Sequence, residues 1–162
     1  MNDDNLTHED SIDIAVDPDV LYDLVSDVTR TGEWSPVCKA CWWDDEAEAG
    51  SVGAWFNGRN ETPQRTWETR SQVMTAERGR EFAWNVGGDM VSWSFRLTPS
   101  EAGTTLTESW HMLPHGVDVF HERYGADAEA QIEDRRWHAH DGIPKTLAAI
   151  KRIAESAEGH AS

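Results

Sequence analysis

The chain has 162 residues and carries 30 acidic against 14 basic side chains, which gives a formal net charge of −16. A surface this acidic repels nucleic-acid phosphates and anionic lipid headgroups, and no stretch reaches the roughly 18 apolar residues of a membrane span. These facts argue against nucleic-acid binding and membrane insertion. The length suits one domain, residues 1–162, and the acidic opening residues lack the layout of a secretory signal, so we expect a cytoplasmic protein.

The first elements expected along the chain are one strand and two short helices. Residues 7–16 alternate as a strand does. A helix start follows at Asp17-Pro18, because an aspartate can cap the free N–H groups and proline suits the first helical turn. A second short helix is expected to begin at Thr29, and we expect Trp34 just after it to plug one end of the sheet.

Six further strands follow in quick succession, separated by residues typical of turns. Their expected ranges are 38–44, 52–60, 65–75, 80–86, 90–98 and 104–111. Such short connections cannot form parallel crossovers, so the sheet is expected to be antiparallel. A period of two gives each strand one covered face. That face is expected to carry five large aromatic side chains, namely Trp67, Trp84, Trp93, Phe95 and Trp110.

The C-terminal third is expected to be helical. Residues 117–124 indicate a short helix over the mouth of the sheet, and a long helix is expected from near Asp127. Its apolar stripe consists of Ile132, Ala139, Ile143, Leu147, Ile150 and Ala154. Pro144 removes a helical donor, which predicts a kink or a break. The expected fold is therefore α+β: a curved seven-stranded antiparallel sheet wrapped around a long C-terminal helix, with a pocket in any space left between them.

Glu108 is the most informative polar residue, because alternation places it on the covered face beside Trp110. Burial raises the pKa of a carboxyl group, and such a group can act as a general acid or base. The alternative is a buried carboxylate paired with a backbone donor or an arginine, for which Arg59 is the candidate. Asn60, Thr69 and Ser71 are expected in the same interior, where they either orient a ligand or hydrogen bond to one another.

The two cysteines form the sequence Cys38-Lys39-Ala40-Cys41. A single CxxC pair leaves three readings open: a structural role, part of a metal site, or a redox pair. A redox pair usually has its reactive thiol at a helix N-terminus, whereas this pair lies where a strand is expected to begin. His138 and His140 are two residues apart on the expected helix and do not share a face, so they make a poor metal pair.

Taken together, these stretches resemble the START-like superfamily (SRPBCC), and within it the polyketide cyclase/dehydrase group. The resemblance runs from about Ile12 to Glu155 and is carried by SIDIAVDPDVLYDLVSDVTRTGEWSP, GAWFNGRN, RTWETRSQV, REFAWNV, VSWSFRLTPSEAGTTLTESW and IPKTLAAIKRIAE. It implies the helix-grip fold of birch-pollen allergens and lipid-transfer START domains. Members commonly hold an apolar ligand between the sheet and the C-terminal helix, and some are aromatase/cyclases.

The residues and the resemblance together predict a protein that binds a small hydrophobic molecule, such as a lipid or polyketide, with no cofactor and no metal. The expected ligand-binding residues are Phe56, Asn60, Trp67, Thr69, Ser71, Trp84, Trp93, Phe95, Glu108 and Trp110. One alternative is a cyclase or dehydratase, with Glu108 as acid or base and Arg59 or Asn60 polarising a carbonyl group. Another is a structural or interaction domain with a filled core and no cavity of roughly 300 Å³ or more.

An aromatic pair on the second expected strand bears on assembly. Adjacent strand residues face opposite ways, so either Trp42 or Trp43 must point outward. An exposed large ring can mark a contact between copies, which makes a homodimer one expected partner arrangement.

Overall fold

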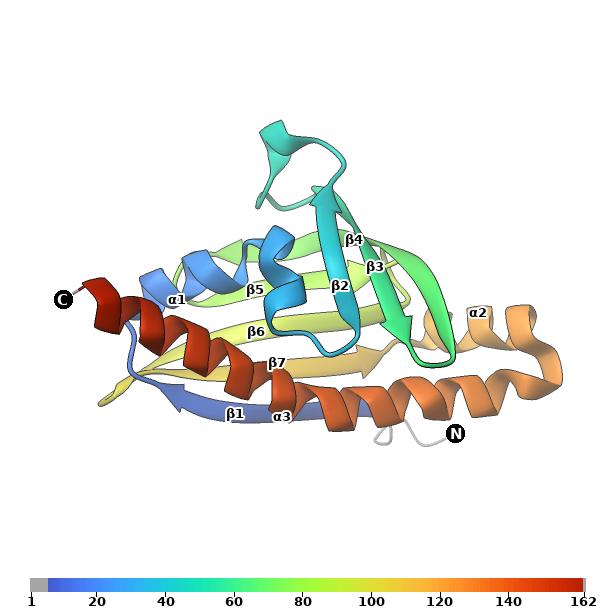
Figure 1. Cartoon of the computed structure of the whole chain (residues 1–162). Helices are drawn as coiled ribbons and strands as arrows, with labels where there is room; N and C mark the ends of the chain where they lie inside the picture. The colour runs from blue at the N-terminus through green and yellow to red at the C-terminus, as the bar shows by residue number, and fades with distance from the viewer. Residues whose placement is uncertain (1–5, 162) are drawn as a thin grey trace.

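The computed structural model describes residues 6–161 and contains one seven-stranded antiparallel sheet in the order β1-β7-β6-β5-β4-β3-β2 (Figure 1). β1 and β2 are therefore the two edges. The strands are β1 (Thr7–Ile14), β2 (Cys38–Trp43), β3 (Trp55–Thr62), β4 (Arg65–Glu77), β5 (Glu81–Val86), β6 (Val91–Ser100) and β7 (Gly103–Met112). Every neighbouring pair is antiparallel, as the short connections predict.

Three α-helices and three short 3₁₀ helices make up the helical part of residues 6–161. They are α1 (Pro18–Val25), η2 (Val28–Glu33), η3 (Glu46–Glu48), α2 (Pro114–Tyr124), η4 (Gly125–Asp127) and α3 (Ala128–Ala161). In Figure 1, α3 crosses one face of the sheet, and α1 and η2 lie on that same side. The architecture is the expected helix-grip fold, with α1 and η2 between the first two strands.

The local sequence explains where the first helix begins. The Asp17 carboxylate accepts a hydrogen bond from the Asp19 N–H at 3.1 Å, and Pro18 occupies the first turn. Leu21 and Val25 on this helix are buried, so its apolar face turns toward the sheet. The capping and proline signals in the sequence therefore place this helix correctly.

β7 shows the clearest alternation of buried and half-exposed side chains. Its buried residues are Thr104, Leu106, Glu108, Trp110 and Met112, and the residues between them are partly exposed. The face assignment made from the period of two is thus confirmed for this strand. Glu108 faces the interior because it shares the parity of Leu106 and Trp110.

Two expectations about element boundaries are wrong. The third strand begins at Trp55 rather than at residue 52, because residues 51–53 form a turn. The predicted break at Pro144 is also absent, since α3 continues through it to Ala161, whereas a kink there stays a prediction. Ile143 and Leu147 on either side are both buried. Burying two such side chains is worth about 3–6 kcal/mol, which offsets the roughly 3 kcal/mol that a proline costs inside a helix.

Of the two adjacent tryptophans on edge strand β2, one is buried and the other is exposed, as alternation requires. Trp43 is buried with 7% exposure, and Trp42 remains 41% exposed. A homodimer contact at Trp42 stays a prediction. Within residues 6–161, none of the helices combines the length and the apolar character needed to cross a bilayer.

Candidate ligand-binding cavity

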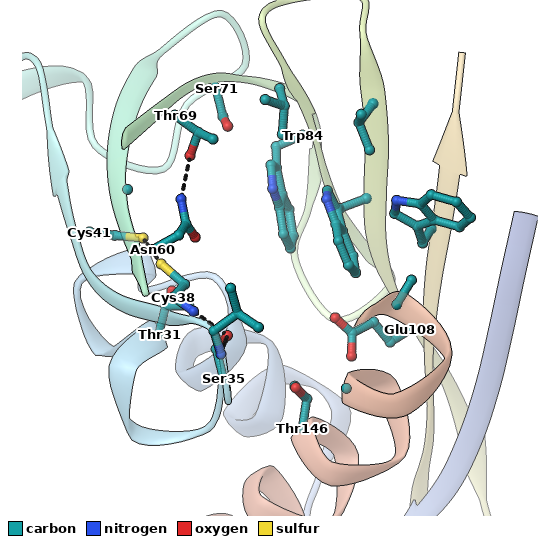
Figure 2. A pocket seen from close by; sticks show the side chains of 18 of the residues that line it. Thr31, Ser35, Cys38, Cys41, Asn60, Thr69, Ser71, Trp84, Glu108 and Thr146 are labelled. Carbon is teal, nitrogen blue, oxygen red and sulfur yellow. Dashed lines mark hydrogen bonds between the residues drawn. The ribbon is translucent and has the colours of Figure 1, made fainter. Parts of the chain in front are cut away.

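A cavity of about 240 Å³ lies between the concave face of the sheet and α3 (Figure 2). Strands β3 to β7 form one wall, α3 forms the facing wall, and the segment from Val28 to Cys41 closes one side. The aromatic side chains that alternation places on the covered face therefore do not fill the interior completely. A molecule of limited size can lie between them and the helix.

The sheet wall is built from two rows of side chains that run across the strands. In the first row Trp84 is paired with Trp93, and Trp93 with Trp110. The Trp84 and Trp93 rings are nearly parallel, with an interplanar angle of 11° and centroids 6.4 Å apart. Directly paired strand residues lie close enough for such rings to stabilise one another, so this row is fixed by the register of β5, β6 and β7.

The second row contains the only acidic side chain that the sheet contributes to the cavity lining within residues 6–161. Phe82 is paired with Phe95, and Phe95 with Glu108. Glu108 is 5% exposed, and its Oε1 has no hydrogen-bond partner within the described part of the chain. Burial raises the pKa of this carboxyl to about 8, because desolvation disfavours the charged form. At neutral pH the group is therefore mostly protonated, and it can both donate and accept a hydrogen bond.

Polar side chains on β3 and β4 form the part of the sheet wall furthest from Glu108 (Figure 2). Asn60 and Ser71 are buried and Thr69 is partly buried. Asn60 Nδ2 donates to Thr69 Oγ1 at 3.3 Å and to the Trp67 carbonyl at 3.4 Å. Of the two expected roles for these residues, hydrogen bonding to one another is therefore seen for Asn60 and Thr69.

The helix wall is open because α3 presents small side chains to the sheet. Ala139, Gly142 and Thr146 all line the cavity and follow the three- and four-residue spacing of one helical face. An added Cβ on Gly142 would lie 3.4 Å from the Pro36 ring, so the η2–β2 connection packs directly against this part of the helix. Figure 2 shows Thr146 on α3 facing the side of the cavity that holds Glu108.

Charged groups lie at one end of the cavity, around Trp67. The Cζ atom of Arg65 lies 3.9 Å from the Trp67 ring centroid, and that of Arg135 lies 5.4 Å from it. Burial and the nearby Arg65 charge lower the pKa of Arg135. Asp134 partly balances this charge through a 2.8 Å ion pair with Arg135. This end of the cavity is therefore more polar than the part of the wall formed by Trp84, Trp93 and Trp110.

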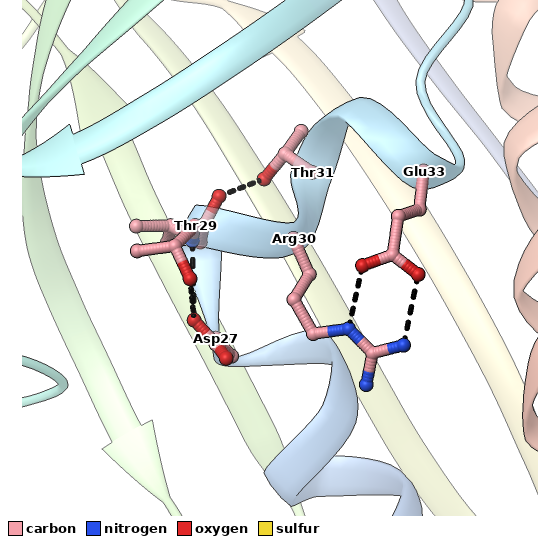
Figure 3. Close-up of polar contacts among 6 residues, drawn as sticks. Asp27, Thr29, Arg30, Thr31 and Glu33 are labelled. Atoms are coloured by element: carbon pink, nitrogen blue, oxygen red, sulfur yellow. Dashed lines mark hydrogen bonds and ion pairs between the residues drawn. The ribbon is translucent and has the colours of Figure 1, made fainter.

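Local hydrogen bonds stabilise the segment from Val28 to Cys41, which is the side wall of the cavity (Figure 3). Asp27 accepts a hydrogen bond from the Thr29 N–H at 3.2 Å and so caps η2. Arg30 and Glu33 form a two-pronged ion pair at 2.7 and 2.8 Å. Thr31, which lines the cavity, donates its hydroxyl to the Val28 carbonyl at 2.7 Å. Trp34 follows directly, is buried, and also lines the cavity, as expected of a side chain that closes the end of the sheet.

The structure brings all ten sequence-predicted site residues to this one cavity. They are Phe56, Asn60, Trp67, Thr69, Ser71, Trp84, Trp93, Phe95, Glu108 and Trp110. Arg59 is different, because it is exposed and lies on the opposite face of β3 from Gly58 and Asn60. Both expectations for Arg59, as the ion-pair partner of Glu108 and as a group that polarises a bound carbonyl, are therefore wrong.

Several cavity residues escaped the sequence reasoning. They are contributed by α3 and by the side wall, and include Thr31, Ser35, Cys38, Cys41, Arg135, His138 and Thr146. The sequence did contain a signal for the cavity residues on α3, because Gly142 and Thr146 interrupt its apolar stripe at positions that face the sheet. No comparable periodicity marks the side wall. Among residues 6–161, no group of three or more His, Cys, Asp or Glu side chains is arranged to hold a metal ion.

Comparison with known proteins agrees with the fold. Residues 6–134 match the family model described as polyketide cyclase / dehydrase and lipid transport. The chain therefore belongs to this family, within the helix-grip class that its sheet and long helix define. No protein with a curated function matches the sequence.

Solved structures show similar folds. The Polyketide_cyc-like protein Cgl2372 from Corynebacterium glutamicum is 54% identical, over 96% of this chain and 94% of that one, with a TM-score of 0.69. The di-domain ARO/CYC StfQ from the steffimycin biosynthetic pathway is 17% identical, over 95% of this chain and 52% of that one, also at 0.69. Protein NE0264 from Nitrosomonas europaea is 14% identical, over 98% and 99%, at 0.66. The last two likenesses concern the fold alone.

Proposed function

We propose that the protein binds a small, largely apolar molecule in the cavity between the sheet and α3. The observation that carries the proposal is the Glu108 carboxyl, which is buried in the cavity wall with no hydrogen-bond partner for Oε1 among the described residues. A buried polar atom without a partner costs roughly 1–3 kcal/mol. A ligand that hydrogen bonds to Glu108 would remove that cost, and the row of indoles beside it would contact the ligand's apolar body.

The cavity volume limits the size of the ligand. An engineered apolar cavity of roughly 150 Å³ holds a benzene molecule, and sites for drug-sized ligands begin near 300 Å³. A cavity of about 240 Å³ lies between these values. It suits a compound of one or two rings better than a long-chain lipid.

The polar groups limit the chemistry of the ligand. A protonated Glu108 can donate to a carbonyl or hydroxyl oxygen and accept from a hydroxyl group. Ser71 and Asn60 lie across the cavity and can meet a second polar group on the ligand. A flat ring compound with oxygen substituents at both ends therefore fits best, and the family description, which includes polyketide cyclases, supports this class of compound.

Native mass spectrometry of the protein purified from its own host tests binding directly, and a retained small molecule is the expected result. Calorimetric titration with 2-naphthol, a two-ring phenol, tests the cavity itself. We expect Trp93→Ala to weaken 2-naphthol binding at least about tenfold, because the ring contributes a large apolar contact. Trp42→Ala is the matched control, since Trp42 lies on the surface of β2 outside the cavity lining.

The absence of 2-naphthol binding to the wild-type protein, together with no retained molecule, would support the alternative of a structural or interaction domain. Equal losses of affinity in Trp93→Ala and Trp42→Ala would show that the probe binds elsewhere.

A second function is favoured by the pKa of Glu108. A carboxyl group that titrates near neutral pH and faces a cavity suits general acid–base catalysis, as in a cyclase or dehydratase acting on a polyketide-like carbonyl compound. Glu108→Gln separates the two functions. A binding protein should keep its affinity for 2-naphthol within a few-fold, whereas an enzyme should lose turnover of its substrate while still binding it.

A further inference from the structure

Cys38 and Cys41 lie side by side although strand geometry should separate them. Residues three apart on a regular strand point to opposite faces. The pairing of β2 with β3 shifts register between Cys38 and Ala40, which is the signature of a β-bulge. The bulge returns both cysteines to the cavity side, and their Sγ atoms are 3.3 Å apart (Figure 2).

The two thiols are free, accessible from the cavity and not shielded by the facing strand. They are the two cysteines of the chain, and neither is in a disulfide. Gly58 on β3 faces them without a side chain, and a Cβ placed there would lie 3.4 and 3.5 Å from the two sulfur atoms. Both sulfurs therefore lie in the wall of a cavity that is apolar over most of its surface.

We propose that Cys38 and Cys41 form a reversible dithiol–disulfide site in the cavity wall, which small organic hydroperoxides entering the cavity oxidise. The entry route rests on the proposed function, because it requires that the cavity admit small apolar molecules. The site itself rests on the bulge and on the separation of the two sulfur atoms. The bond requires an approach of little more than 1 Å, from 3.3 Å to the roughly 2.0 Å of a disulfide.

The two cysteines have different roles in this chemistry. The hydrogen bond between Cys38 and Cys41 lowers the pKa of the Cys41 thiol, and burial opposes part of this effect. The same contact with Cys41, together with burial, raises the pKa of Cys38. We assign the attack to Cys41 and the resolving role to Cys38, because the thiol with the lower pKa provides more of the reactive thiolate.

The reaction is a two-electron oxidation of the dithiol. The Cys41 thiolate attacks the terminal oxygen of the hydroperoxide, the O–O bond breaks, and the alkoxide takes the proton that Cys41 released. Cys38 then attacks the resulting Cys41 sulfenic acid, the S–O bond breaks, and the leaving hydroxide takes the Cys38 proton. The products are the disulfide, one alcohol and one water, and the hydroperoxide is the group that is reduced.

Intact mass spectrometry after treatment with cumene hydroperoxide, with iodoacetamide added under denaturing conditions, tests the site. We expect monomeric wild-type protein to lose two hydrogen atoms and both alkylation sites, and dithiothreitol to restore them. In Cys38→Ser, Cys41 should form a sulfenic acid that dimedone traps. In Cys41→Ser, Cys38 should remain a thiol that iodoacetamide alkylates. Two alkylatable thiols in treated wild-type protein, or a disulfide between two chains, would overturn the proposal.

Treatment with hydrogen peroxide tests the dithiol site independently of the proposed ligand-binding function. Faster oxidation by cumene hydroperoxide than by hydrogen peroxide at equal concentration supports entry through the apolar cavity, and equal or slower oxidation overturns that route. If 2-naphthol does not bind but hydrogen peroxide still forms the disulfide, the binding function fails and the dithiol site stands. If 2-naphthol binds and neither peroxide forms the disulfide, the dithiol site fails alone.

Discussion

The two sides of the cavity differ in how they are built. On β5, β6 and β7, aromatic side chains and Glu108 occupy directly paired positions in regular strands. On β2, β3 and β4, the lining is smaller and more polar, and β2 contains a bulge. Regular pairing and large rings give the first side its stability, whereas the second side has thiols, hydroxyls and an amide that can change partners. The comparison predicts that substitutions on the first side destabilise the fold more than those on the second side.

Trp110→Ala should have the largest effect on stability. Trp110 is 2% exposed, and replacing a buried tryptophan by alanine costs about 3–5 kcal/mol in lost contacts and a new void. Urea denaturation measures this loss. Trp137→Ala is the matched control, because Trp137 on α3 is 57% exposed and its removal should change stability by less than about 0.5 kcal/mol. Similar losses in both variants would contradict the assignment of Trp110 to the core.

Glu108→Gln should change how stability depends on pH. The folded-state pKa of about 8 lies above the ordinary value of 4.5, so the neutral carboxyl is the form that folding favours. Ionisation in the unfolded chain therefore destabilises the wild type as the pH rises from about 4.5 to about 8, and the penalty is complete above that range. The total is on the order of a few kcal/mol.

Glutamine cannot ionise, so the difference between the two proteins isolates this residue from the rest of the acidic surface. Urea denaturation at pH 5 and pH 8 should show that the stability of Glu108→Gln relative to the wild type increases with pH. A difference that stays constant between the two pH values would mean that Glu108 is already ionised in the folded protein.

Thr69→Ala should have a smaller effect, on the polar side of the cavity. It removes the hydroxyl that accepts from Asn60 Nδ2, while the contact of Asn60 with the Trp67 carbonyl remains. A single neutral hydrogen bond contributes roughly 1 kcal/mol, so the urea midpoint should fall slightly. Thr66→Ala is a suitable control, because Thr66 lies on the same strand and is exposed. A loss as large as that of Trp110→Ala would show that both sides of the cavity stabilise the fold equally.

Arg59→Gln should have the smallest effect. The side chain is exposed and lies on the outer face of β3, so neither the stability nor the pH dependence assigned to Glu108 should change measurably. Urea denaturation at pH 5 and pH 8 compares the stability of Arg59→Gln with that of the wild type, as for Glu108→Gln. A change in the pH dependence would restore Arg59 as a partner of that carboxyl.

Much of the cavity follows from alternation along single strands. Residues of equal parity on β7 face the interior together, which places Glu108 and Trp110 without knowledge of any other strand. The same rule, applied to β3, separates Asn60 from Arg59, so the error about Arg59 arose from not following parity between adjacent residues. Local capping likewise places the start of α1 at Asp17.

Other features depend on contacts between distant parts of the chain. Whether Glu108 is paired or lacks a partner depends on what α3 and the side wall bring near it, and no local pattern encodes that. The continuation of α3 through Pro144 depends on the burial of Ile143 and Leu147 against other elements. The cavity itself depends on small residues of α3 meeting large residues of the sheet.

The amino-acid sequence alone determined the order of elements, the faces of the strands and the aromatic, Glu108-bearing wall, because a period of two and helix caps act over a few residues. Only the tertiary structure decided the volume of the cavity, the lack of a partner for Glu108 Oε1 among the described residues, and the meeting of Cys38 with Cys41. Each of these depends on a bulge, a register or a packing contact that joins residues far apart in the chain.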